Sequence, residues 1–292
     1  MEKFKFKGII LSGGMGTRLS PVTKILNKQL LPLYDKPIIF YSLSVLMLAK
    51  IKNILIIVNP NDLQSYKKLF GDGSRLGLNL KYEIQHKPLG LPEAFKIGEK
   101  FISSNPVALI LGDNFFYGQG LANRLEQITI GSRGCTVFLY PVVDPSSYGI
   151  AKIYKGKIVK IIEKPKKKIS NLAITGLYFF DNNVCKFAKK LKPSKRNETE
   201  ITDIIKMYLK RKKLRYEFLG RGSAWLDTGT FDKLYQASDF VKTIEERQGL
   251  KIACIEEIAF KNGWIDKKKF EESIKFYGRC EYSNYLKKII SQ

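Results

Sequence analysis

Short apolar runs alternate with longer stretches of helical periodicity through the first part of the chain. The apolar runs are bounded by glycine and polar residues, as buried strands are, and cover Gly8–Leu11, Asn53–Val58, Leu80–Gln85 and Val107–Leu111. Between them, apolar residues recur at helical spacing over Ile38–Lys50, Asn61–Phe70 and Pro92–Ile102. Strands that alternate with helices predict an α/β fold with a parallel sheet and right-handed crossovers.

The pattern changes at Cys135, after which strands follow one another through short turns. The predicted strands are Cys135–Val143, Gly149–Tyr154, Ile158–Glu163, Ile174–Phe180 and Leu214–Leu219. Helices are predicted at Asn183–Leu191, Glu200–Lys212 and Thr230–Gln248, with short helices to the end of the chain. No internal repeat or low-complexity linker divides the sequence. We therefore expect one mixed α/β domain over residues 1–292: a first half over 1–134, a β-rich half over 135–229 and a helical appendage over 230–292.

The stretch Gly8–Pro37 contains the strongest candidate for a ligand site. Its first strand stops at the loop Ser-Gly-Gly-Met-Gly-Thr-Arg, residues 12–18. Glycines let the backbone approach a ligand closely, and successive inward N–H groups form an anion-binding concavity. Arg18 and Lys28 add positive charge. The loop matches neither GxGxxG nor GxxxxGK[ST], and an ordinary glycine-rich turn after a strand remains the alternative.

Three polar positions fall at predicted strand ends. The Gly13 loop and Asp113 each follow an apolar run, and Gln85 is the last residue of one. Ligands of parallel α/β sheets bind beyond the carboxyl ends of the strands, so these positions predict a site along one edge of the sheet.

Composition is that of a globular protein with an unusual charge. The chain has 292 residues, 44% of them hydrophobic, and a formal net charge of +24. No apolar stretch reaches the length of a transmembrane helix, and the N-terminal residues leave no room for a signal peptide. We expect a cytoplasmic protein without a membrane partner.

The charge permits two interpretations. A basic chain can bind nucleic acid or membrane, or lysines can decorate solvated faces. We favour the second, because the lysines are scattered and no RNA-binding motif or zinc finger is present; specific nucleic-acid binding is not expected. The denser clusters, Lys164–Lys168 and Lys210–Lys213, remain candidates for non-specific polyanion contact.

Cysteine and histidine usage argues against a zinc site. The cysteines are Cys135, Cys185, Cys254 and Cys280, none at zinc spacing, and His86 is the single histidine. We expect free buried thiols and a surface or loop position for His86.

The string GGMGTRLSPVTKILNKQLLPLYDKP, residues 13–37, closely resembles the signature of the sugar-1-phosphate nucleotidylyltransferase family, and Lys28-Gln-Leu-Leu-Pro resembles its glucose-1-phosphate thymidylyltransferase branch. The match continues to about Trp264. The resemblance implies a Rossmann-like, mostly parallel mixed sheet flanked by helices. It also implies Mg²⁺-dependent formation of dTDP-glucose and pyrophosphate from dTTP and α-D-glucose 1-phosphate, by a homotetramer. The alternatives are a relative specific for UTP or another sugar, and a non-catalytic regulatory paralogue.

Two aspartates are the candidate metal ligands. Asp113 follows a buried strand in Leu-Gly-Asp-Asn, and Asp227 lies in what we interpret as a Trp-Leu-Asp-Thr-Gly turn. Mg²⁺ is usually held by one or two carboxylates together with substrate phosphates. Each aspartate alone is also compatible with a helix cap or Asx-turn, but the two motifs resemble the family's metal-binding motifs.

The resemblance also implies roles for the other site residues. Arg18 and Lys28 correspond to phosphate-contacting catalytic residues, together with Asp113 and Asp227. Nucleotide-binding positions are Leu11, Gly13, Gly14, Gly16, Thr17, Arg18, Gln85, Gly90 and Asp113. Sugar-phosphate positions are Lys28, Asn114, Tyr148, Gly149, Glu163, Lys164, Ile174, Arg196 and Trp225. Leu89 and Pro92 depart from the residues common in the family, which leaves the preference for dTTP over UTP open.

The resemblance further implies a second nucleotide-sugar site for a pathway end product such as dTDP-rhamnose. The matching positions are Gly118, Gln119, Arg221, Glu257 and Lys261. Gln119 replaces a usual His and Lys261 a usual Arg, and lysine lacks the planar fork with which arginine grips phosphate. We therefore expect weaker feedback inhibition than in relatives with His and Arg. The alternative is that these are ordinary surface positions.

Overall fold

The computed structural model describes residues 5–131, 133–194 and 197–291. Its centre is a parallel sheet of four strands, β1 (Lys7–Ser12), β4 (Asn53–Val58), β5 (Asn79–Ile84) and β6 (Val107–Leu111). Neighbouring side chains of a strand enter opposite faces: Ile54 and Ile56 join one hydrophobic cluster, whereas Leu55 and Ile57 join the other. Both faces are therefore buried, which explains the continuous apolar runs.

The second half of the chain extends this sheet with mainly antiparallel pairing. The added strands are β8 (Cys135–Pro141), β9 (Gly149–Tyr154), β10 (Lys157–Glu163), β11 (Leu172–Phe180) and β12 (Leu214–Phe218). The order is β10-β9-β11-β6-β1-β4-β5, with β8 pairing β11 and β12. Strand β11 pairs β6, β8 and β9 and so joins the two halves.

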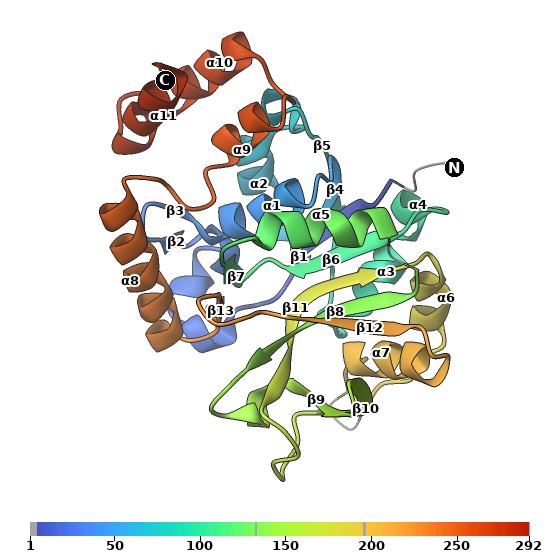
Figure 1. Cartoon of the computed structure of the whole chain (residues 1–292). Coiled ribbons are helices and arrows are strands. Elements are labelled where there is room, and N and C mark those ends of the chain that lie inside the picture. Colours follow the sequence, from blue (N-terminus) through green and yellow to red (C-terminus); the bar gives the residue numbers. More distant parts are fainter. Residues whose placement is uncertain (1–4, 132, 195–196, 292) are drawn as a thin grey trace.

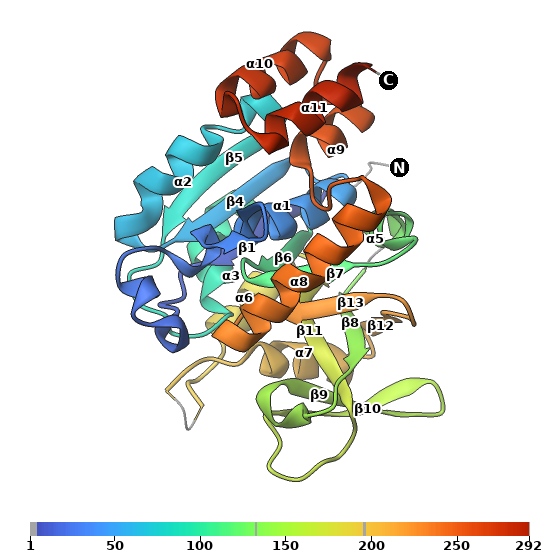
Figure 2. The ribbon, with the colours of Figure 1, turned by 90° about the vertical axis from the view of Figure 1, so that its left-hand side faces the viewer.

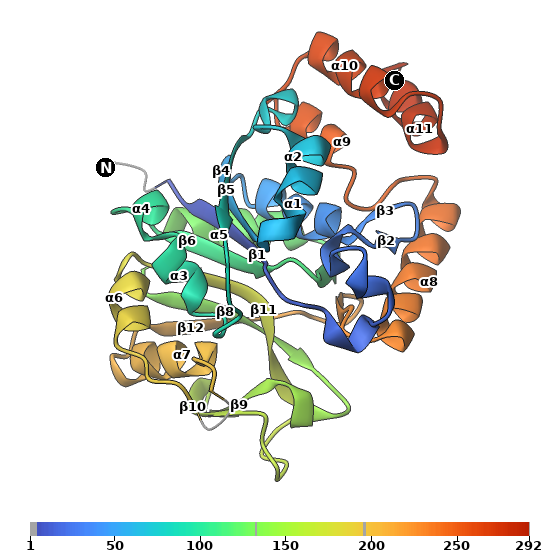
Figure 3. The same cartoon turned by 180° about the vertical axis from the view of Figure 1, so that it is seen from behind.

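Helices cover both faces of the sheet (Figures 1 and 3). Helices α1 (Ile38–Leu48), α2 (Leu63–Phe70), α5 (Leu121–Gly131) and α9 (Ile255–Lys261) contribute to the cluster on one face. Helices α3 (Glu93–Ile97), α4 (Glu99–Ile102), α6 (Asn183–Lys189) and α7 (Ile201–Lys210) contribute to the other. The prediction of a mixed sheet flanked by helices, with a β-rich second half, is confirmed.

A third cluster lies beside the sheet, under α8 (Phe231–Gln248), which runs along the left edge of the molecule in Figure 1 and crosses its front in Figure 2. Ala237 and Val241 of α8 pack with residues of two small ribbons. These ribbons are β2 (Pro32–Leu33) with β3 (Lys36–Pro37), and β7 (Asn114–Tyr117) with β13 (Ala224–Asp227). Short 3₁₀ helices occupy Thr17–Leu19, Val22–Lys24, Lys28–Leu30, Pro60–Asp62, Ser74–Leu76 and Pro145–Ser147.

The predicted helical appendage is also present. Helices α9, α10 (Lys267–Tyr277) and α11 (Glu281–Ser291) gather at one end of the molecule (Figure 1). The fully buried Glu256 accepts hydrogen bonds from Tyr277 at 2.8 Å and Tyr282 at 2.6 Å. Arg75, on the segment before β5, pairs with the same carboxylate at 3.2 Å. The appendage is thus held on the sheet domain by a buried charge as well as by apolar packing.

Some local predictions are wrong. Trp225 and Asp227 belong to strand β13, because this segment pairs with β7, which the sequence analysis did not predict; neither did it predict α5. The helix predicted over Pro92–Ile102 is divided at Gly98, which lies so close to Ile9 and Leu55 that a Cβ would be about 3 Å from both (3.0 and 3.1 Å).

Three of the cysteines are free and buried as expected, but Cys280 is exposed. It lies directly before α11, where its sulfur accepts a hydrogen bond from the Ser283 N–H. His86 lies exposed in a loop, as predicted. Within the described ranges, every helix is too short or too polar to cross a membrane.

Candidate functional site

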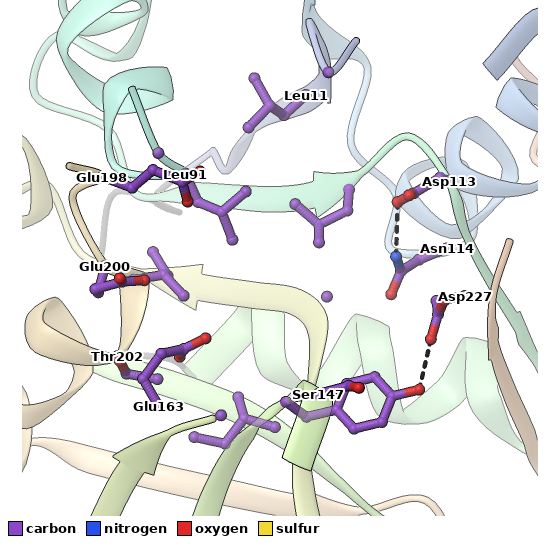
Figure 4. Close-up of a pocket in the computed structure, with 18 of the residues that line it drawn as sticks. Leu11, Leu91, Asp113, Asn114, Ser147, Glu163, Glu198, Glu200, Thr202 and Asp227 are labelled. Carbon is purple, nitrogen blue, oxygen red and sulfur yellow. Dashed lines mark hydrogen bonds between the residues drawn. The ribbon is translucent and has the colours of Figure 1, made fainter. Parts of the chain in front are cut away.

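A cleft of about 400 Å³ opens at the carboxyl ends of β1, β5 and β6, the edge that the sequence predicted. It is lined by most of the predicted site residues, namely Leu11, Gly14, Arg18, Gln85, Gly90, Asp113, Asn114, Tyr148, Gly149, Glu163, Lys164, Ile174, Trp225 and Asp227. Asp113, Asn114 and Asp227 lie on one side of the cleft, and Glu163, Glu198 and Glu200 lie on the opposite side (Figure 4).

Contacts with neighbouring side chains fix the position of the glycine loop after β1. Gly16 has a left-handed backbone with φ 61°, which favours glycine, and its carbonyl accepts a hydrogen bond from Thr23 at 2.9 Å. Gly13 lies against Gln85, where a Cβ would be 2.1 Å from Oε1 of that amide. The loop therefore stands next to the strand end that carries Gln85. Gly13, Gly16 and Thr17 are not among the residues that line the cleft.

Lys28 reaches the site from a capped 3₁₀ turn. Asn27 caps this turn by accepting from the Gln29 N–H at 3.0 Å, and its amide is fixed by Tyr66 and Asp62 from the α2 region. The buried Lys28 ammonium forms an ion pair with Asp113 Oδ2. Lys28 is not among the lining residues, but its ammonium group reaches the wall of the cleft at Asp113.

The β7–β13 ribbon places the two aspartates on one wall. Asp227 is paired with Asn114 in the ribbon register, directly after Asp113. The Asn114 amide donates to Asp113 Oδ1 at 2.9 Å and accepts from Trp225 Nε1 at 2.7 Å. Thr228 also donates to the Asp113 carbonyl, from its backbone N–H and its hydroxyl. The position of Asp113 relative to Asp227 is therefore fixed by hydrogen bonds on both chain segments.

Both oxygens of the Asp227 carboxylate have partners. The Lys233 ammonium donates to Oδ1 at 3.0 Å and to Oδ2 at 2.8 Å, and the Tyr148 hydroxyl donates to Oδ2 at 2.6 Å. Burial alone would raise the pKa of Asp227, but the hydrogen bonds from Lys233 and Tyr148 and the Lys233 charge outweigh it, so its pKa lies below the usual value. Burial and the hydrogen bond to Asp227 raise the pKa of Tyr148.

Arg18 and the Asp227 carboxylate both lie close to Gly229. A Cβ on Gly229 would lie 2.8 Å from Arg18 Nη2 and 2.8 Å from Asp227 Oδ1. Gly229 also donates its N–H to Asp227 Oδ1 at 3.2 Å. The glycine therefore leaves room for a guanidinium from the β1 loop and a carboxylate from β13 close to the same backbone position.

The opposite side of the cleft is built from the second half of the chain. Gly90, with φ 113°, forms a bridge with Thr199, where a Cβ would be 2.1 Å from the Thr199 carbonyl. Thr199 donates its N–H to the Leu89 carbonyl at 2.8 Å. This contact fastens the loop that follows β5 to the segment before α7, and so closes the cleft between the two halves.

The residues proposed for a second nucleotide-sugar site fall in two groups. Gly118 and Gln119 follow β7, and Gly118 packs against Ser223 in the loop that carries Arg221. Glu257 and Lys261 lie one turn apart on α9, joined by a 2.6 Å ion pair, and Tyr285 donates to Glu257 at 2.6 Å. The second site stays a prediction. Arg196, predicted to contact phosphate, lies outside the described residues.

Comparison with known proteins decides the family. The nucleotidyl transferase family model matches residues 7–244. A glucose-1-phosphate thymidylyltransferase of Neisseria meningitidis serogroup A is 49% identical over 287 residues, covering 98% of this chain and 100% of that protein. The chain belongs to the nucleotidyl transferase family, among its glucose-1-phosphate thymidylyltransferases.

Solved structures agree with this family. A structure from Bacillus anthracis, assigned as a glucose-1-phosphate thymidylyltransferase and in complex with sucrose, matches with TM-score 0.75 and 38% identity, over 80% of this chain and 94% of that one. A UDP-glucose pyrophosphorylase in complex with UDP-glucose matches with TM-score 0.71 and 26% identity, over 82% of this chain and 99% of that one. The uridylyl enzyme is thus the more distant of the two.

The donor set fits the divalent metal of a nucleotidyl transferase. Asp113 and Asp227 supply carboxylate oxygens on one wall, and in the described part of the chain no group of three or more His, Cys, Asp or Glu residues is placed to hold a metal. A metal at these aspartates would therefore take its remaining ligands from substrate phosphates and water, which is how Mg²⁺ is commonly bound.

Sequence analysis missed several lining residues of this nucleotidyl transferase. They are Gln29, Pro88, Leu91, Leu111, Ser147, Tyr178, Glu198, Thr199, Glu200, Ile201, Thr202 and Lys233. One feature of the sequence could have pointed to Lys233 as a site residue. This lysine lies in the first turn of α8, where the helix dipole disfavours a cation, so a nearby anion was to be expected.

Proposed function

We propose that this chain transfers the thymidylyl group of dTTP to α-D-glucose 1-phosphate and releases pyrophosphate. The observation that carries the proposal is the convergence of Arg18, Lys28, Asp113 and Asp227, from three separate segments, at one edge of a cleft that is large enough for a ligand. The near full-length relationship to a thymidylyltransferase supports the same choice of nucleotide over the UTP alternative. We also propose a homotetramer, as the family resemblance implies.

In the proposed reaction, a phosphate oxygen of the sugar phosphate attacks the α-phosphorus of dTTP in line. A new P–O bond forms as the bond to the β-phosphate bridging oxygen breaks, and pyrophosphate carries away that electron pair. The nucleophile belongs to the substrate, so the protein mainly positions groups and stabilises charge. Arg18 and Lys28 supply fixed positive charge for the phosphates.

The remaining side chains orient the two substrates. The nearly buried Gln85 has an amide that donates and accepts at once, which suits a pyrimidine edge at the end of β5. The sugar phosphate lies in the proposal between Tyr148, Glu163 and Lys164 on the opposite wall. Mg²⁺ held by Asp113 and Asp227 would offset negative charge on the α-phosphate and on the leaving pyrophosphate.

Pyrophosphate release tests the proposal directly. With dTTP, glucose 1-phosphate and Mg²⁺, the protein should form dTDP-glucose and pyrophosphate in equal amounts. Asp113→Asn and Asp227→Asn should each lower kcat by on the order of 10²-fold or more, since transition-state electrostatics are lost. Asp239→Asn, an exposed aspartate on α8, is the matched control and should keep wild-type turnover. Near wild-type turnover of either site variant at saturating Mg²⁺ would show that its carboxylate does not hold the metal.

A further inference from the structure

Lys233 extends its ammonium group into the catalytic cleft from the first turn of α8. Thr230 caps this helix by accepting a hydrogen bond from the Lys233 N–H at 3.4 Å, which fixes the turn that carries the side chain. Lys233 lines the same cleft as Asp227, and about a third of its side chain is exposed (35%). The residue is therefore anchored at its backbone but has a long side chain that reaches the cleft.

The ammonium group has three hydrogen-bond acceptors around it. It donates to Asp227 Oδ1 at 3.0 Å, to Asp227 Oδ2 at 2.8 Å and to the Tyr148 hydroxyl at 2.9 Å. A lysine has three N–H donors, so this position uses all of them. The cation lies against both oxygens of the carboxylate that would hold the metal.

Lys233 lies at a helix position that is unfavourable for a positive charge. A positive charge in the first turn of a helix opposes the helix dipole, so Lys233 is stabilised by its partners across the turn and not by α8 itself. Asp227 supplies the compensating charge. Lys28 pairs with Asp113 in the same way, so both candidate metal ligands are neutralised by a lysine of the chain.

We propose that Lys233 is an internal cation that competes with divalent metal for Asp227, so that the protein binds metal weakly until nucleotide phosphates arrive. The inference rests on the proposed function for the metal role of Asp227. When metal binds, the Lys233 ammonium leaves the carboxylate and pairs with a phosphate oxygen of the bound substrate within the same cleft. The nucleotide then supplies both the extra metal ligands and a new partner for the displaced lysine.

Mn²⁺ binding to the free protein tests this competition without any reaction. Free Mn²⁺ is followed by its paramagnetic resonance signal during titration of wild type and Lys233→Met, which keeps most of the side-chain volume and removes the charge. The expected result is Mn²⁺ binding about ten-fold tighter in Lys233→Met, as for loss of one charge-assisted interaction. Lys242→Met, on the same helix with an exposed ion pair to Glu246, controls for net charge and should change affinity less than two-fold.

Lys233→Arg tests whether charge is the cause. It keeps a cation beside Asp227 and should bind Mn²⁺ as weakly as wild type. Equal Mn²⁺ affinity in wild type and Lys233→Met, or an equal gain in Lys242→Met, would overturn the proposal.

Two further titrations separate this inference from the proposed function. With dTTP present, after correction for Mn²⁺ bound by dTTP alone, the nucleotide should tighten metal binding more in wild type than in Lys233→Met. Asp227→Asn combined with Lys233→Met should lose the gain in affinity. A gain that survives this change would place the metal elsewhere and overturn both proposals. Strong Mn²⁺ binding that depends on Asp227 but not on Lys233 would overturn the competition alone.

Discussion

Gly229 shows how a single side chain would disturb the site. Its missing Cβ makes room for Arg18 and Asp227, each of which would lie 2.8 Å from that atom. Real Cβ atoms essentially never come this close to a neighbour, so a methyl group must displace the guanidinium or the carboxylate. In the proposed reaction Arg18 contacts phosphate and Asp227 holds the metal, and small errors of position are costly for such transfers.

We therefore expect Gly229→Ala to lower kcat/KM for pyrophosphate release by roughly ten- to a hundred-fold, with an unchanged melting temperature. Gly220→Ala is the matched control, because a Cβ there meets no described atom within 4 Å. Steady-state kinetics of both variants, with their thermal unfolding, check the prediction. Wild-type kinetics of Gly229→Ala would mean that Arg18 and Asp227 need no such close approach.

At the scale of elements, one buried carboxylate joins the helices of the appendage to the sheet domain. Glu256 of α9 is fully buried and is contacted by Arg75, Tyr277 and Tyr282, from the sheet domain and from α10 and α11. Removing one partner of a buried ion pair leaves an uncompensated charge, which is more costly than the pair is favourable.

Arg75→Met should accordingly destabilise the protein by about 3 kcal/mol in urea unfolding. Arg75→Met/Glu256→Gln should recover part of this loss, because the unpaired charge is gone. Lys206→Met, which removes an exposed pair with Asp203, should cost less than about 1 kcal/mol. An Arg75→Met loss no larger than that of the exposed pair would show that Glu256 is compensated by the tyrosines alone.

Elements were predictable where the sequence pattern is local. The strands β1, β4 and β6 are apolar runs bounded by polar residues, and Asp113 and Gln85 follow from their positions at strand ends. The ribbon of β7 and β13 was not predictable, because each strand has four residues and is stabilised by pairing with a distant segment. The hydrogen bonds among Lys233, Tyr148 and Asp227 were likewise not predictable, because Tyr148 is far from the other two in the sequence and contacts them only in the folded chain.

At the scale of the whole molecule, the charge of +24 is compatible with a small-molecule enzyme. The clusters Lys164–Lys168 and Lys210–Lys213 consist mostly of exposed residues. A cleft with phosphate substrates also gains from a positive field.

We expect labelled duplex DNA to bind weakly, without preferred sequence, and with affinity that falls steeply between low and physiological salt. Titration of two unrelated DNA sequences at both salt concentrations checks this expectation. Tight binding that distinguishes the sequences at physiological salt would instead support a nucleic-acid partner.

The central claim is the transfer of a thymidylyl group, and the choice of nucleotide tests it most directly. The measurement is kcat/KM for dTTP, UTP, dATP and GTP at fixed glucose 1-phosphate and Mg²⁺, followed by pyrophosphate release. The Gln85 amide at the end of β5 predicts that pyrimidine nucleotides are better substrates than purine nucleotides, and the relationship to thymidylyltransferases predicts dTTP above UTP. A purine as the best substrate, UTP equal to dTTP, or no pyrophosphate from any of the four would contradict the account.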